Sequence, residues 1–404
     1  MKFLHLSDLH IGKNVNGFSM MNEQRHVFEQ IIKYIRSEHP EAVVIAGDVY
    51  DRAVPNIEAV RIFDDFLTEL ADLDVAVMLI SGNHDSPERL NYASRILSGK
   101  KIFMYGTFNG NLGKIVLSDE YGDVNFWLLP FVKPSSVYGM FDDREIESYG
   151  DVLEAVIETA DIDYTERNVL VAHQFFTKTG VAPIRSESEI NPVGGLDAID
   201  CRMLENFDYV ALGHLHGAQK VGAEHIRYAG SPVKYSFSEW RQEKSVTVVE
   251  LNEKGNINLT AVPIQPIHDM REIRGKIGEL TAFQSQEDKT DKIDKTDKDD
   301  RSREDYLRVI LTDEDEIIDP MGKIRSVYPN VMSLDFENSR SSIDLSEIIP
   351  DSEKIEKLSL YDLFSEFFLD VNGSVMSEEQ GKIVGEILDS VMGSMGSGTE
   401  KGDV

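Results

Sequence analysis

The residues of this sequence that could carry chemistry follow five short apolar runs. The runs are FLHL (3–6), AVVIAG (42–47), VAVMLI (75–80), VLVAH (169–173) and YVALGH (209–214). At the end of each run or just beyond it stands an aspartate, asparagine or histidine: Asp8, His10, Asp48, Asn83, His84, His173, His214 and His216. Since α/β proteins bind ligands at the carboxyl ends of their strands, the pattern predicts one site. Gly47, Gly82 and Gly213 would allow the sharp turns and close backbone approach that such a site requires.

All of these residues except His84 are candidate metal ligands. They combine carboxylate, amide oxygen and imidazole without a thiolate, a set that suits manganese, iron or zinc better than a structural zinc site. Seven ligands exceed one coordination sphere, whereas two ions that share a bridging carboxylate can use them all. Two ions about 3.5–4 Å apart clamp a phosphate and stabilise both its attacking and its leaving oxygen. The residue types therefore predict a two-metal centre.

Each fragment has a simpler explanation when it is taken alone. Residues 83–85 suit a turn, and Pro87 suits the first turn of a helix. An Asp-x-His or His-x-His pair is common by chance. All five fragments in order, each at a predicted strand end, favour the metal site. Arg52 and Arg89 lie beside them, where they could contact a substrate phosphate or form structural ion pairs.

Amphipathic helices are expected between the strands that position these residues. Apolar side chains recur at helical spacing in two segments, with Val27, Ile31 and Ile35 in the first and Val60, Phe63, Leu67 and Leu70 in the second. From about residue 225 to 265, three strand-like runs follow one another without helices. This mixture predicts an α/β domain with a mixed or two-sheet core.

The composition changes beyond residue 265. We expect a small α+β module at 266–348 that contains a mobile, solvated DK-rich insertion at 286–303. Two amphipathic helices follow at 349–392, and a disordered tail is expected at 393–404. The first helix has a wide apolar face formed by Leu360, Leu363, Phe364, Phe367 and Phe368.

Composition and charge limit the compartment and the partners. The chain has 404 residues, a net charge of −31 and one cysteine, Cys201. A single cysteine fits a reducing cytoplasm, and no apolar run is long enough to span a membrane. The apolar stretch at the N-terminus is too short for a signal peptide. We therefore expect a soluble cytoplasmic protein whose average surface repels DNA phosphates.

The motifs SDLHIGK, GDVYDRAVP, SGNHDSPERL, AHQFF and GHLH resemble those of the calcineurin-like metallophosphoesterases, and more narrowly those of the bacterial SbcD nuclease family. The resemblance is strong over about the first 265 residues and looser beyond them. It implies a two-sheet metallophosphoesterase sandwich flanked by helices at 1–265. A small α+β DNA-capping domain would follow at 266–348, and C-terminal helices at 349–392 would bind an SMC-family ATPase of the SbcC type.

The resemblance also assigns roles to the candidate residues. Two Mn²⁺ ions would be held by two sets of four ligands that share a bridging Asp48. The sets are Asp8, His10, Asp48 and His216, and Asp48, Asn83, His173 and His214. His84 would face the phosphate as a catalytic residue without binding metal.

The activity implied is that of a DNA nuclease, with 3′-to-5′ exonuclease action on duplexes and endonuclease action on single strands or hairpins. It would serve DNA repair, recombination and replication as a homodimer within a heterotetramer, away from membranes. The partner and the two cations would supply the positive field that this acidic chain lacks. Two other classes stay open: a phosphomonoesterase or cyclic-nucleotide phosphodiesterase, and a non-catalytic scaffold. The roughly 140 residues after the first domain argue against the former, and the complete ligand set argues against the latter.

Overall fold

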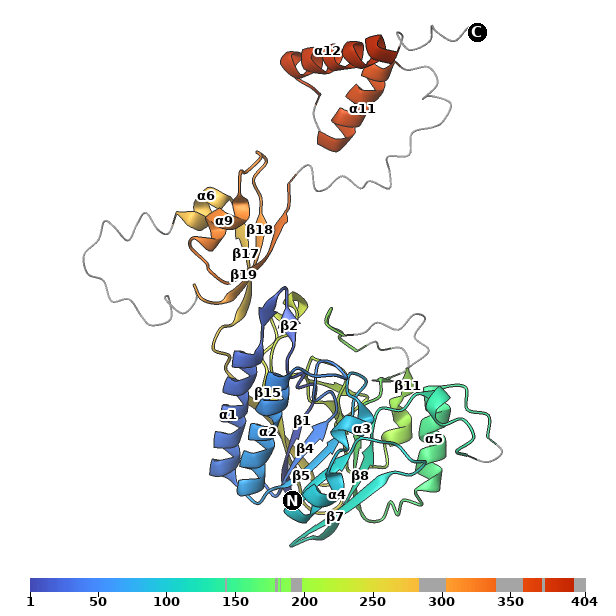
Figure 1. Ribbon diagram of the computed structural model, residues 1–404. Coiled ribbons are helices and arrows are strands. Elements are labelled where there is room, and N and C mark those ends of the chain that lie inside the picture. The colour runs from blue at the N-terminus through green and yellow to red at the C-terminus, as the bar shows by residue number, and fades with distance from the viewer. Residues whose placement is uncertain are drawn as a thin grey trace, which may run out of the picture. The chain divides into compact units, whose positions relative to one another are not determined.

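The computed structural model describes residues 1–141, 144–178, 181, 183–189, 198–282, 303–338, 359–372 and 375–395. The chain divides into two compact units, Met1–Arg271 and Glu272–Val404 (Figure 1). Apart from Arg303 and residues 393–395, the DK-rich insertion predicted at 286–303 and the tail predicted at 393–404 lie outside the described residues.

Unit 1 contains two six-stranded sheets. The first has the order β16-β15-β1-β4-β5-β6, formed by Ile257–Pro263, Ser245–Leu251, Lys2–Leu6, Ala42–Ala46, Ala76–Ile80 and Ile102–Tyr105. The second has the order β13-β14-β12-β9-β8-β7, formed by Gln219–Val221, Ala223–Tyr228, Tyr209–Leu212, Arg167–Ala172, Gly122–Leu129 and Gly113–Asp119. Strands β1, β4, β5 and β6 are parallel, and so are β8, β9, β12 and β14. Each sheet therefore gathers the carboxyl ends of four strands at one edge.

Helices cover the outer faces of the two sheets. Helices α1 (Met21–Glu38) and α2 (Ile57–Asp72) lie side by side along the first sheet (Figure 1). Helix α5 (Tyr149–Thr159) packs Val152 and Val156 into a core shared with the second sheet. Because both faces of the central strands are covered, those strands are mostly apolar, for example AVVIA in β4 and YVAL in β12, as buried parallel strands usually are.

The inner faces of the sheets share one core. Phe3 and Val44 of the first sheet pack with Phe126, Val171 and Tyr209 of the second. The ring of Phe3 meets that of Phe126 edge to face, with centroids 5.4 Å apart. Burying one such side chain stabilises the fold by about 1.5–3 kcal/mol, so this layer fixes the sheets relative to each other.

The buried face of α2 differs from the predicted one. The sequence predicts Val60 on the apolar face, but this side chain is 44% exposed. The buried positions are Ala59, Ile62, Phe63, Phe66 and Leu70. The helix follows the N-cap Asn56, whose side-chain oxygen accepts a hydrogen bond from the Ala59 amide at 2.8 Å.

Among its described residues, unit 1 also contains six short strands and α-helices. They are β2 (Asn14–Val15), β3 (Phe18–Ser19), β10 (Phe176–Thr177), β11 (Ile199–Asp200), α3 (Pro87–Leu90) and α4 (Ser94–Leu97). Pro87 occupies the first helical position of α3, as the sequence predicts.

The second unit holds a small sheet and a helix pair. Strands β17 (Met270–Gly275), β18 (Tyr306–Leu311) and β19 (Val331–Phe336) form the sheet. Helices α6 (Ile277–Thr281) and α9 (Pro320–Arg325) pack with it around Leu307, Val309 and Ile324.

Helices α11 (Leu360–Asn372) and α12 (Glu378–Met395) contact each other where Gly381 faces the Tyr361 hydroxyl. Phe367 and Leu360 of the predicted apolar face of α11 are 57% and 52% exposed. No helix in the described part of the chain combines the length and apolarity needed to cross a bilayer. The predicted fold class, an α/β sandwich of two sheets with flanking helices and a smaller α+β module, is confirmed.

Candidate metal centre

All eight predicted residues lie in the loops that leave the carboxyl ends of five parallel strands. The loops after β1, β4 and β5 of the first sheet supply Asp8, His10, Asp48, Asn83 and His84, and those after β9 and β12 of the second supply His173, His214 and His216. The His173 Nδ1 atom lies 2.7 Å from the Ala46 carbonyl oxygen, and the His214 amide donates to Asp8 Oδ1 at 2.9 Å, so hydrogen bonds join the strand ends of the two sheets.

Four of the eight residues have a left-handed backbone, which side-chain-bearing residues rarely adopt. The φ angles are 52° at Asp8, 42° at His10, 51° at Asp48 and 102° at His214. Such conformations cost about 1–3 kcal/mol each and gather at functional sites, where the surrounding fold holds them. Here they turn the polar side chains out of the strand direction and toward one another.

Glycines beside the motifs permit the close approach of the loops. A Cβ atom added to Gly213 would lie 2.0 Å from the Ala46 oxygen and 2.6 Å from His173 Nδ1. One added to Gly82 would lie 2.1 Å from Asp48 Oδ1. Any side chain at these positions would displace a predicted ligand.

One group of donor atoms surrounds Asn83. Its Oδ1 atom lies 3.1 Å from His173 Nε2 and 3.0 Å from His214 Nδ1. Adjacent ligands of an octahedral ion with bonds of about 2.1 Å lie about 3.0 Å apart. The spacing therefore fits three ligands on one ion, and Asp48 Oδ2, 3.2 Å from His173 Nε2, fits a fourth.

A second group surrounds His10. Its Nε2 atom lies 3.1 Å from His216 Nε2 and 3.6 Å from Asp48 Oδ2. Donor atoms of Asp8, His10 and His216 all lie within 4.8 Å of one another. Asp48 thus stands between the two groups, where a single carboxylate can serve both.

Burial and charge at the centre match a site for divalent cations. Asp8 and Asp48 are 0% and 2% exposed, and two buried carboxylates without a cation would be costly. Burial raises the pKa of Asp8. Burial also opposes charge on Asp48 and His173, but their mutual attraction outweighs it, which lowers the pKa of Asp48 and raises that of His173 to about 9.

The pKa values of two other imidazoles are shifted in the opposite direction to that of His173, downward. Burial lowers the pKa of His214 to about 3 and that of His10 well below its ordinary value. Both rings are therefore neutral at physiological pH, which is the form that binds metal. The donor types fit two divalent ions, which would have to displace the proton that His173 carries in the metal-free protein. Asp8, His10, Asp48, Asn83, His173, His214 and His216 would hold them.

His84 sits beside the second group. Its Nδ1 atom lies 3.0 Å from the Asp51 carbonyl oxygen, and its backbone N–H donates to Asp48 Oδ1 at 2.9 Å. A carbonyl only accepts hydrogen bonds, so Nδ1 carries the proton and Nε2 is left for substrate or metal. One of its ring nitrogens lies within 4.8 Å of donor atoms of His10 and Asp48, so the geometry accommodates a proton donor as well as a ligand.

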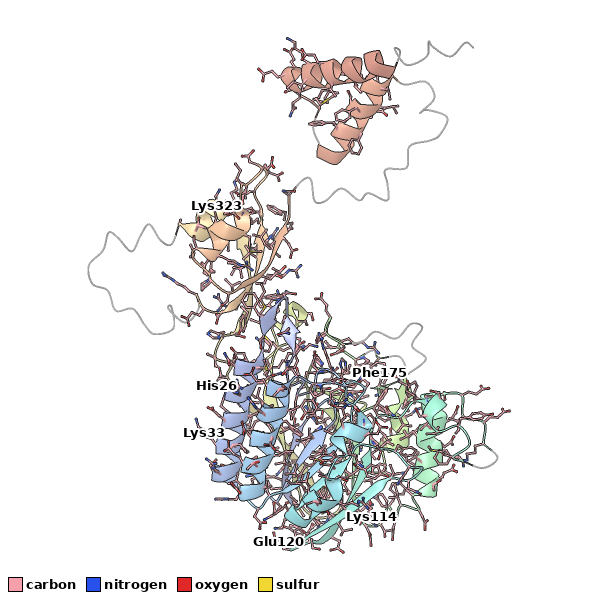
Figure 2. All side chains as sticks on the ribbon, viewed as in Figure 1. His26, Lys33, Lys114, Glu120, Phe175 and Lys323 are labelled. Carbon is pink, nitrogen blue, oxygen red and sulfur yellow. The ribbon has the colours of Figure 1, made fainter. Side chains whose placement is uncertain are left out.

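The two arginines singled out in the sequence lie at the surface. The Arg52 side chain is 79% exposed, with its Nε 3.6 Å from Asp51 Oδ2, a weak ion pair in water. Arg89 is exposed on α3. Arg185, which the sequence analysis did not single out, has its guanidinium carbon 3.8 Å from the ring centre of Phe175, which is labelled in Figure 2.

Further residues that the sequence did not indicate hold the ligand loops. The side-chain amide of Gln24 donates to the carbonyl oxygen of His10 at 2.8 Å. Asp85, which the sequence suggested only as a turn residue, accepts three backbone hydrogen bonds from the loops after β4 and β5. Ser188, Glu239 and Lys244 surround His216. Asp85 belongs to the motif SGNHDSPERL, but Gln24, Ser188, Glu239 and Lys244 lie outside the quoted motifs, and none of these four belongs to a recognisable pattern.

Comparison with known proteins gives similarity along nearly the whole chain. Residues 1–218 match the family model described as calcineurin-like phosphoesterase, and residues 266–372 match one described as type 5 capsule protein repressor C-terminal domain. The protein named as the D component of nuclease SbcCD from Staphylococcus epidermidis is 30% identical over 97% of this chain and 99% of its own length. Its namesake from Staphylococcus saprophyticus is 29% identical over 97% of this chain and 99% of its own length.

Among solved structures, TT1561 of Thermus thermophilus aligns with a TM-score of 0.38 at 12% identity. The alignment covers 64% of this chain and 98% of that one. A dimetal phosphatase from Danio rerio aligns with a TM-score of 0.38 at 14% identity, over 65% of this chain and 96% of that one.

Proposed function

Because the chain belongs to the calcineurin-like phosphoesterase family, and within it to the family of SbcD nucleases, we propose that it is a metal-dependent phosphodiesterase that cleaves DNA. The observation that carries the proposal is the position of Asp48. Its Oδ2 atom lies 3.2 Å from His173 Nε2 in one donor group and 3.6 Å from His10 Nε2 in the other. A carboxylate between two sets of ligands is what a two-metal phosphoesterase centre requires.

The metals of this proposal are two Mn²⁺ ions. Asp8, His10, Asp48 and His216 would hold one, and Asp48, Asn83, His173 and His214 the other. Two such ions supply a clamp for the scissile phosphate and a nucleophile at neutral pH. Oxygen and imidazole donors without thiolate suit manganese, although zinc and iron accept the same donors.

His84 is the proton donor in this proposal. Its ring is fixed by the hydrogen bond from Nδ1–H to the Asp51 carbonyl, and its backbone N–H anchors Asp48. The imidazole is thereby held beside the proposed bridging ligand, where Nε2–H of the protonated ring can donate to the leaving oxygen. Donation from a positioned side chain contributes typically about 10²–10⁴ in rate.

The substrates of the proposed enzyme are duplex DNA, cleaved from 3′ ends, and single-stranded or hairpin DNA, cleaved internally. Residues 1–265 would be the nuclease domain, 266–348 would cap the DNA, and 349–392 would bind an SMC-family ATPase of the SbcC type. The net charge of −31 supports a partner, because the chain alone repels phosphates on average. In cells the assembly would be a heterotetramer built on a homodimer of this chain, acting in the cytoplasm in DNA repair.

The activity is tested with purified protein, Mn²⁺ and 3′- or 5′-end-labelled duplex and hairpin DNA. Cleavage that requires Mn²⁺ and is lost in Asp48→Ala is expected. Hydrolysis of a phosphomonoester or a cyclic nucleotide without cleavage of any DNA would instead place the chain in the alternative enzyme class. Absence of hydrolysis on all substrates, with both metals bound, would make it a scaffold.

The partner is tested by truncation at about residue 350. The exposed apolar side chains of α11, among them Leu360 and Phe367, support a docking role. The truncated chain should remain a folded Mn²⁺-dependent nuclease, no longer co-purify with the ATPase and gain nothing from ATP. Unchanged binding of the ATPase would place the docking surface elsewhere.

A further inference from the structure

A buried polar cluster behind His216 has no role in the proposed function so far. It contains an ion pair between Glu239 and Lys244, whose Oε2 and Nζ atoms are 2.7 Å apart. Glu239 is 0% exposed and Lys244 is 8% exposed. Replacing a buried pair of this kind with apolar residues is often neutral for stability or even stabilising, so stability alone does not explain its presence.

The cluster holds His216 on both its side chain and its backbone. His216 Nδ1 lies 2.8 Å from Ser188 Oγ and 3.3 Å from Glu239 Oε1. The His216 carbonyl oxygen accepts a hydrogen bond from Lys244 Nζ at 2.9 Å, and its amide donates to Glu189 Oε1 at 2.7 Å. Few torsions of this residue are left free, because each polar group on its inner side has a partner.

The direction of the hydrogen bonds fixes the tautomer of the ring. Glu239 is held ionised by Lys244, and a carboxylate only accepts. Ser188 Oγ donates its single proton to Glu239 Oε1 at 2.7 Å, so the serine oxygen can only accept from His216 Nδ1. Nδ1 must therefore carry the ring proton, which leaves the lone pair of Nε2 facing His10 Nε2 at 3.1 Å.

Lys244 keeps Glu239 in place. Its three N–H donors have four acceptors within reach: Glu239 Oε2, the His216 carbonyl, Ser231 Oγ at 2.9 Å and Gln242 Oε1 at 2.8 Å. Ser236 Oγ donates a further bond to Glu239 Oε1 at 3.1 Å. The carboxylate is thus surrounded by donors and cannot turn away from the histidine.

We propose that Glu239 is a positioning residue that acts through Ser188, and is held by Lys244, to present the Nε2 lone pair of His216 to a divalent cation. The inference rests on the proposed function, in which His216 binds one of two metal ions. Residues that hold a metal-binding histidine in this way typically affect metal affinity by about 10–100-fold.

The test compares Mn²⁺ binding by four full-length proteins, with free Mn²⁺ measured by electron paramagnetic resonance. They are the wild type, Glu239→Gln, the apolar double variant Glu239→Leu with Lys244→Met, and Asp208→Asn as a control. Asp208 is also a buried carboxylate paired with a lysine, with its Oδ2 atom 2.8 Å from Lys254 Nζ. It precedes the amino end of β12, whereas His214 follows the carboxyl end, so Asp208 lies at the opposite end of the strand from the candidate ligands. Thermal unfolding of each metal-free protein is measured in parallel.

The wild type and the Asp208→Asn control should both bind two Mn²⁺ ions. The double variant should bind one ion as tightly as the wild type and the other about 10–100-fold more weakly, at an unfolding temperature close to that of the wild type. Glu239→Gln, which keeps an acceptor oxygen but no charge, should show a smaller loss at the same site. A loss of Mn²⁺ affinity without a loss of thermal stability distinguishes a positioning role from a structural one.

Two results would overturn the inference. One is wild-type affinity for both ions in a folded variant, and the other is failure of both Glu239 variants to fold, which would assign the pair a structural role. A wild-type chain that binds fewer than two Mn²⁺ ions would contradict the proposed function itself. That outcome is measured on the wild type alone, so it is distinct from any result obtained with the variants.

Discussion

Asp85 offers a quantitative test of how the metal centre is built. Its Oδ2 atom accepts hydrogen bonds from the amides of Val49 at 3.1 Å and Gly82 at 2.9 Å, and Oδ1 accepts one from Tyr50 at 2.9 Å. The side chain is 6% exposed and joins the loop that carries Asp48 to the loop that carries Asn83. Asp85→Asn keeps the shape of the side chain but replaces one acceptor oxygen with an NH₂ donor.

The expected effect depends on whether metal is bound. In the better orientation the amide oxygen takes the Oδ2 position and only the Tyr50 amide loses its partner, which costs about 1–3 kcal/mol. In the metal-free protein, burial and the nearby Asp48 charge raise the pKa of Asp85 to about 6. A shift of this size means that the ionised carboxylate destabilises the metal-free fold by about 3 kcal/mol at pH 7. Removing the charge therefore offsets the lost hydrogen bond.

Bound cations would neutralise Asp48 and remove the part of that offset that comes from its charge, whereas the part that comes from burial would remain. Asp85→Asn should therefore weaken Mn²⁺ binding as well as change metal-free stability. We expect metal-free unfolding temperatures that nearly coincide. The stabilisation by saturating Mn²⁺ should be smaller in the variant by up to about 3 kcal/mol, or up to about 12 °C. Scanning calorimetry with EDTA and with Mn²⁺ measures both, and Asp65→Asn, on an exposed position of α2, is the control. An equal Mn²⁺-induced rise in the variant and the wild type would refute the reasoning.

Three further changes test separate parts of the site. His84→Ala should retain both metals and DNA binding while cleavage of labelled DNA falls by about 10²–10⁴, and loss of metal would show instead that His84 is a ligand. Gly213→Ala places a Cβ 2.0 Å from the Ala46 oxygen, so the free energy of unfolding should fall by about 1–3 kcal/mol or more, with a lower unfolding temperature and weaker Mn²⁺ binding. An unchanged unfolding temperature would contradict the close approach. The folded-state pKa of His173 is raised to about 9, so its stabilising charge is fully present below about pH 6.5 and is lost as pH rises through 9. Metal-free protein should therefore lose stability between those pH values and the Mn²⁺ form should not, and parallel declines in the two forms would contradict the assignment.

The eight candidate residues at the strand ends could be predicted from the sequence, because strand ends have local sequence signatures. Apolar runs such as AVVIA end where Gly47 and Asp48 follow, and the parallel sheet then brings such ends together. The residue types at those ends specify the donor atoms without any knowledge of the fold. For this reason all eight candidate residues could be named before their contacts were known.

The residues that hold these side chains in place, such as Ser188 and Glu239, could not be predicted, because their contacts join distant segments of the chain. Glu239 and Ser188 lie 51 positions apart, and their roles depend on a proton whose place is set by a third residue. The prediction for Val60 was wrong for a related reason: it is apolar and roughly in phase, but α2 buries Ile62 and Phe66 instead. Periodicity cannot predict a choice that tertiary packing makes.

The central claim, one centre with two metal ions bridged by Asp48, is tested most directly by anomalous scattering at the manganese edge. Crystals of the full chain grown with Mn²⁺ are measured beside crystals of Asp48→Ala. The account predicts two peaks in the wild type, one among Asp8, His10 and His216 and one among Asn83, His173 and His214, with Asp48 touching both, and neither peak in the variant. A single peak at saturating Mn²⁺, or two peaks that persist without the Asp48 carboxylate, would contradict it.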